Sequence, residues 1–142
     1  PANALQCSAR FPEVCQSCAE VEAVFRARPD LPPRQRGHAV WTPLYAAYFH
    51  DCYALAQRYL DRGQSPSLGG NEGDLLATIV QWNRFDYTYR RAWARMLVAH
   101  GAGLDTTGLD GLTTRERLTQ AAANDPDIAR LLGDIRQWLN EQ

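Results

Sequence analysis

The chain has 142 residues, of which 45% are apolar, and a formal net charge of −1 at pH 7. This length favours one domain, and the apolar content is typical of a globular protein and not of a disordered one. The near-neutral charge argues against a surface built for nucleic acid or for an anionic membrane. No apolar run approaches the ~20 residues that a membrane-spanning helix requires. All 15 basic residues are arginine, which we interpret as the base composition of a GC-rich, bacterial genome.

The chain begins at Pro1, without an initiator methionine. A cleaved signal peptide, removal of methionine before proline, or trimming of the chain would each explain this start. Four cysteines are present: Cys7, Cys15, Cys18 and Cys52. Their even number and N-terminal clustering favour disulfides and hence the mature form of a periplasmic protein, with a cytoplasmic location and plain thiols as the alternative. A metal or redox site is a further alternative, but no second Cys-x-x-Cys pair and no zinc-finger spacing of histidines support it.

The N-terminal segment predicts a divergent helical unit. Leu5 to Arg10 is a weak candidate for its first helix, and the apolar spacing from Cys18 to Phe25 predicts its second helix. Pro29 to Arg36 is a stiff, proline-rich connection that we expect to take the place of a hairpin.

The stretch from Thr42 to Gly63 carries the signals of two short helices. Thr42 is a good N-cap, and Pro43 suits the first helical position because its missing N–H has no partner there. The small pair Ala46-Ala47 allows a second helix to pack closely, and an apolar stripe around Tyr59 predicts that helix. Gly63 supplies the left-handed conformation that ends it.

This stretch, with Thr42-Pro43-Leu44 followed by the paired alanines, resembles the T-P-L-H-x-A unit of the ankyrin-repeat family. The resemblance implies an all-α fold, a short solenoid of about three and a half helix-turn-helix units with a divergent N-terminal cap. Residues 1–142 then form a single domain. Its parts are a cap with the proline-rich connection (1–36), a repeat (37–70), a repeat with an insertion (71–109), and a repeat with the C-terminal cap (110–142).

The later units are degenerate. Asp74 stands where the capping threonine would be, and apolar residues within 75–80 and 92–97 predict two helices. Asp74 to Gly101 spans 28 positions, against 22 from Thr42 to Gly63. We place the extra residues at 83–89, between the helices or lengthening them. The third unit begins near residue 110 and breaks at 124–127, where Pro126 starts the last amphipathic helix.

The resemblance also implies where a partner binds, because ankyrin repeats contact partners through the hairpin tips and the positions after the paired alanines. Carried over to this chain, the positions are His38, Trp41, Phe49 and His50 in the good repeat and Asn71, Gln81 and Trp82 in the next. Tryptophan and phenylalanine at such positions predict exposed apolar surface. We expect the extra segment, with Arg84, Phe85, Tyr87 and Tyr89, to bind the partner and to lie outside the core, since arginine and aromatic residues are typical of interfaces.

The resemblance places Cys18 and Cys52 at similar points of successive units, which are separated by a helix diameter of ~10 Å. That distance disfavours a direct bridge without adjustment, so Cys15–Cys52 and Cys7–Cys52 are equal candidates. We expect Cys52 to be tied to the N-terminal segment by one of these pairs.

Ankyrin repeats bind partners and as a rule perform no chemistry, so we expect no catalytic residue, no cofactor and no metal. We expect a protein partner, no nucleic acid and no membrane insertion. Small exported ankyrin-like proteins resemble immunity proteins, which neutralise a toxic effector such as a secreted lipase or another envelope hydrolase by occluding its active site. One alternative is a periplasmic adaptor or protective protein that binds a host enzyme. The other is a small hydrolase or thiol-redox protein that uses His50 with Cys18 or Cys52.

Overall fold

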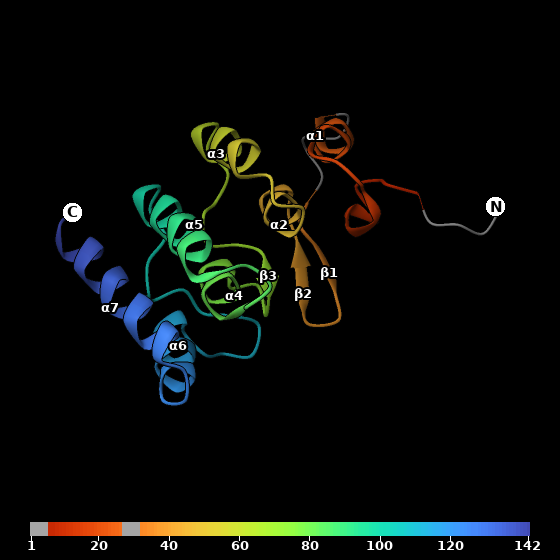
Figure 1. The fold of residues 1–142 in the computed structure, drawn as a ribbon. Coiled ribbons are helices and arrows are strands. Elements are labelled where there is room, and N and C mark those ends of the chain that lie inside the picture. Colours follow the sequence, from red (N-terminus) through yellow and green to blue (C-terminus); the bar gives the residue numbers. More distant parts are fainter. Residues whose placement is uncertain (1–5, 27–31) are drawn as a thin grey trace.

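The structure is a computed structural model that describes residues 6–26 and 32–142. Over these residues it is mostly helical, with a small antiparallel sheet (Figure 1). In chain order the elements are η1, a 3-10 turn (Pro12–Val14), α1 (Cys18–Arg26), β1 (Arg34–Arg36), β2 (Ala39–Trp41), α2 (Pro43–Phe49), α3 (Tyr53–Asp61), β3 (Gly70–Asn71), α4 (Leu75–Gln81), α5 (Tyr87–Ala99), α6 (Thr114–Ala122) and α7 (Pro126–Asn140). Within this part of the chain, none of the helices combines the length and apolar character of a transmembrane span.

The predicted helix starts are confirmed by their caps. The Thr42 hydroxyl accepts a hydrogen bond from the Tyr45 amide at 3.0 Å, and Pro43 is the first residue of α2. Asp74 caps α4 by accepting from the Ala77 amide at 3.2 Å, and Pro126 begins α7. These local hydrogen bonds satisfy N–H groups that have no partner inside the helix.

Three pairs of helices follow one another along the molecule, from α2–α3 through α4–α5 to α6–α7, and α1 packs against α2 at the N-terminal end (Figure 1). Gly63, just after α3, adopts a φ of +96°, and Gly101, after α5, a φ of +106°. Both values are left-handed, and Gly63 ends its helix as the sequence predicts. Tyr59, on the predicted apolar stripe, and Trp93, within the apolar stretch 92–97, are buried.

The helical content agrees with the predicted all-α class, and the structure adds a small three-stranded sheet to it. β1 and β2 form a hairpin around Gly37, and β3 pairs with the other edge of β2. The proline-rich connection does not replace a hairpin, because its last three residues, Arg34–Arg36, are the strand β1 and pair with β2. Pro29 to Leu31 lie outside the described residues.

The extra residues of the second unit lie in two places. α2 and α4 both have 7 residues, but α5 has 13 residues and α3 has 9. The segment between α4 and α5 (82–86) is also longer than the one between α2 and α3 (50–52). The insertion thus both extends a helix and lengthens the turn before it.

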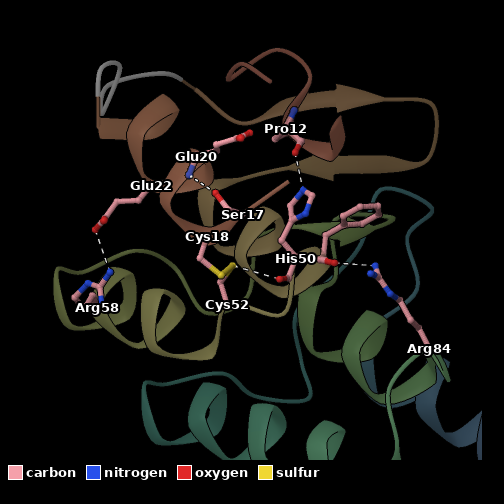
Figure 2. The surroundings of a disulfide bond; sticks show 10 residues. Pro12, Ser17, Cys18, Glu20, Glu22, His50, Cys52, Arg58 and Arg84 are labelled. Atoms are coloured by element: carbon pink, nitrogen blue, oxygen red, sulfur yellow. Dashed lines mark hydrogen bonds and ion pairs between the residues drawn. A yellow bond between two sulfur atoms is a disulfide. The ribbon is translucent and has the colours of Figure 1, made fainter. Parts of the chain in front are cut away.

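Two disulfides, Cys7–Cys15 and Cys18–Cys52, fix the N-terminal segment. Cys52 is therefore tied to this segment as predicted, and its partner is Cys18, with 5.7 Å between the Cα atoms (Figure 2). The bridge is possible because α1 lies against the turn between α2 and α3, closer than a full helix diameter. Residues 8–10 form bends inside the loop that Cys7–Cys15 closes, and residues 6–7 are not helical either, so the helix predicted for Leu5 to Arg10 is wrong there; Leu5 lies outside the described residues.

We predict that the two disulfides contribute unequally to stability. Cys18–Cys52 closes a loop with a sequence separation of 34, and Cys7–Cys15 one of 8. On loop entropy, the variant Cys18→Ser/Cys52→Ser should lose about 4 kcal/mol of unfolding free energy and Cys7→Ser/Cys15→Ser about 2.5 kcal/mol. Urea denaturation of both variants and the oxidised parent measures this difference. A larger loss of unfolding free energy in Cys7→Ser/Cys15→Ser than in Cys18→Ser/Cys52→Ser would contradict this prediction.

Candidate functional site

A cleft of about 400 Å³ opens between α2, α4 and the turn that holds β3. Its lining residues are Tyr45, Phe49, Asn71, Ala77, Thr78, Gln81, Trp82 and Arg117. Four of them, Phe49, Asn71, Gln81 and Trp82, are residues that we expect to contact a partner. The structure therefore brings predicted partner-contact residues from two successive helix pairs together in the lining of one cleft.

The glycine-rich turn at residues 69–73 is held firmly against α4. The Asn71 amide donates to the Thr78 hydroxyl at 2.8 Å. A Cβ on Gly70, whose φ is +76°, would lie 2.6 Å from that same oxygen. Only glycine lets the strand approach α4 so closely, and the approach places Asn71 on the wall of the cleft.

An aromatic cluster lies beside the cleft, and three of its members, Tyr45, Phe49 and Trp82, line it. The cluster consists of Trp41, Tyr45, Tyr48, Phe49, Tyr53, Trp82, Phe85, Tyr89 and Trp93. Ring centroids of Phe49 and Trp82 lie 5.7 Å apart, which joins the end of α2 to the end of α4. Both side chains are half-buried, so each packs on the cluster and keeps a face toward the cleft.

Trp41 does not offer exposed apolar surface, and our prediction for it is wrong. Its side chain is only 9% exposed, with its ring 4.6 Å from that of Tyr45. The Arg36 guanidinium lies 5.0 Å from the same ring and pairs with Glu13. The N-terminal segment therefore covers this tryptophan, a contact that spacing within one repeat does not indicate.

The aromatic residues of the extra segment belong partly to the core, which also corrects our prediction. Phe85, Tyr87 and Tyr89 are half-buried and pack against the core cluster. Burial raises the pKa of Tyr89. The Tyr87 hydroxyl donates to Asp134 on α7 at 3.3 Å, so Tyr87 points toward the last helix pair and not into the cleft.

The two predicted histidines lie outside the cleft lining. His38 is exposed on the β1–β2 hairpin, with its Nδ1 atom 2.9 Å from the Glu72 carboxylate. His50 follows α2, and its Nε2 atom lies 2.7 Å from the Pro12 carbonyl oxygen (Figure 2). His50 therefore joins α2 to the N-terminal segment. Because Cys18 and Cys52 are bonded to each other, neither supplies the thiolate nucleophile that the hydrolase alternative requires.

Two further residues, Arg117 and Tyr45, line the cleft although the sequence pattern does not predict them as contact residues. Arg117 comes from α6 and forms ion pairs with Asp110 and with Asp74, whose Oδ2 atom is 3.4 Å from its Nε atom. Burial raises the pKa of Asp74, and the Arg117 hydrogen bond lowers the pKa of Asp110. The charge of Arg117 is thus matched within the protein, so this side chain completes the wall without adding an unpaired charge.

Comparisons with protein-family models, with curated proteins and with solved structures find no match to this chain. Among the described residues, the one group of potential metal ligands is Cys7, Cys15 and Glu20. Its two sulfur atoms are joined in a disulfide and are not available as thiolate ligands. The aromatic cleft is therefore the candidate functional site.

Trp41 and Trp82 provide a direct test of this corrected assignment. We expect Trp41→Ala to lower the unfolding free energy by about 3 kcal/mol or more, since it leaves a cavity in the core. Trp82→Ala, which removes a half-buried ring, should cost about 1 kcal/mol. Urea titrations followed by far-UV circular dichroism measure both values. If both variants lost the same small amount of unfolding free energy, Trp41 would be a surface residue and the corrected assignment would be wrong.

Proposed function

We propose that this chain is a non-catalytic protein-binding domain whose cleft takes up an apolar side chain of its partner. The single observation that carries the proposal is the pair of contacting rings, Phe49 and Trp82, in the lining of the cleft, with Asn71 and Gln81 in the same lining. Aromatic anchors surrounded by hydrogen-bonding groups are characteristic of the centres of protein interfaces. The net charge of −1 favours a protein over a nucleic acid as the partner.

We further propose that the three helix pairs are degenerate ankyrin-type repeats. The support is that α2 and α4 each follow an extended segment and start with a side-chain cap, and that left-handed glycines follow α3 and α5. In such a stack the hairpins and the first helix of each pair form the binding side. The cleft lies among these elements, with walls from α2, α4 and β3.

Within this class we propose that the chain is a bacterial immunity protein, which neutralises a toxic effector such as a secreted lipase or another envelope hydrolase. Its support is the resemblance to exported ankyrin-like proteins, together with two disulfides that suit an oxidising compartment such as the periplasm. A loop beside the effector's active site would enter the cleft, and the domain would then cover that active site. An adaptor that binds a host enzyme would use the same cleft.

Site-specific photocrosslinking tests the proposal. Gln81 is exposed and lines the cleft, so a photoreactive phenylalanine analogue at this position should yield one discrete protein adduct in the native compartment. Gln120, exposed on α6 and absent from the cleft lining, is the matched control position. Mass spectrometry of the adduct identifies the partner and separates an effector from a host enzyme. No adduct at 81, or the same adducts at both positions, would contradict binding through the cleft.

A further inference from the structure

We propose that Arg84 determines which partner segment the cleft accepts: one that places an aspartate or glutamate adjacent to a large apolar side chain. This inference rests on the proposed function and adds the chemistry of the bound segment. It is carried by the position of Arg84, which extends from the α4–α5 turn toward the C-terminal end of α2 (Figure 2).

Three aromatic rings lie against the guanidinium of Arg84. Its central carbon is 5.1 Å from the ring centroid of Phe49, 5.5 Å from that of Trp82 and 5.2 Å from that of Phe85. The Nη1 atom also donates to the Phe49 carbonyl oxygen at 2.7 Å. These contacts hold the side chain in one orientation, so it loses little further rotamer freedom when it binds another group.

The aromatic contacts of Arg84 are complete, but its charge has no partner among the described residues. Arg36 lies over Trp41 and pairs with Glu13. Arg91 lies over Trp138 in the same way and pairs with Asp134. Arg84 takes part in no such ion pair within the described part of the chain, and its side chain is exposed.

Within residues 6–26 and 32–142, three other arginines lie over an aromatic ring and form no ion pair with a carboxylate: Arg10, Arg95 and Arg130. Among these described residues, each of the three lies over a single ring, and that ring is not part of the cleft lining. Of the described arginines, Arg84 alone lies against three rings, two of which, Phe49 and Trp82, line the cleft.

A carboxylate is the ligand that this arrangement fits best. A guanidinium can donate two parallel hydrogen bonds to one carboxylate, and stacked rings reduce the water that competes for those bonds. Arg117, the arginine of the cleft lining, is already paired with Asp110 and Asp74. Phe49 and Trp82 contact Arg84 and also line the cleft. An acidic side chain of the partner bound to Arg84 would therefore lie beside an apolar side chain bound in the cleft.

Selection of a phage-displayed library of random peptides tests the inference. The wild-type protein should enrich peptides with Asp or Glu adjacent to Trp, Phe or Leu, and Arg84→Glu should enrich Lys or Arg at the acidic position. Arg95→Glu, a charge reversal at an arginine stacked on Trp138, is the matched control and should enrich the wild-type pattern. A peptide selected on the wild type should bind Arg84→Ala about tenfold or more weakly.

Each other outcome overturns a stated claim. Peptides that require Phe49 and Trp82 but lack an acidic residue, or that bind Arg84→Glu as tightly as wild type, would overturn the role of Arg84 and leave the proposed function standing. Peptides that bind the Phe49→Ala/Trp82→Ala variant as tightly as wild type, or no enrichment at all, would overturn the proposed function itself. Tight binding of oligothymidine that is lost in Arg84→Glu would instead make this a nucleic-acid surface.

Discussion

Burial of Tyr48 between two helix pairs is the interaction on which the cleft depends. Its side chain is fully buried, and its ring lies 5.0 Å from Trp93 of α5 and 5.6 Å from Trp82 at the end of α4. The hydroxyl oxygen is 3.5 Å from the Ile79 carbonyl oxygen, and burial raises the pKa of this phenol. Tyr48 therefore joins α2 to both α4 and α5, with aromatic contacts worth about 1 kcal/mol each beyond their area. Because α2 and α4 both line the cleft, these contacts of Tyr48 fix the spacing of the two helices there.

The N-terminal segment holds α2 from its other side. The Cys18–Cys52 bridge and the hydrogen bond from His50 to Pro12 both act at the turn that follows α2 (Figure 2). The Arg36–Glu13 pair adds a contact at the hairpin that precedes it. These contacts fix α2 at both ends and hold Phe49 in place. For the binding role that we propose, such preorganisation would reduce the entropy lost when a partner binds, which would give the disulfide-bonded N-terminal segment a role beside stability.

The sequence predicts helix starts and ends correctly where these depend on neighbouring residues. The cap at Thr42, the stop at Gly63 and the break before Pro126 depend on a few neighbouring residues, and all three are confirmed. The failures depend on distant contacts. Trp41 lies under Arg36, which Glu13 of the N-terminal segment holds in an ion pair, and Arg117 reaches the cleft from the last helix pair. Part of the candidate site could therefore be predicted from the pattern around Thr42 to Gly63, while the burial of Trp41 and the position of Arg117 depend on the packing of separate parts of the chain.

Hydrogen exchange on a Tyr48→Leu variant tests most directly whether these contacts of Tyr48 hold α2 and α4 in place around the cleft. If they do, mass spectrometry should show faster exchange in peptides from α2 and from the α4–α5 turn, while peptides from α7 keep wild-type protection. The change removes the ring that joins the helix pairs but leaves the contacts between α6 and α7 intact. Unchanged exchange around residues 43–49 and 82–86, or an equal increase along the whole chain, would contradict the account.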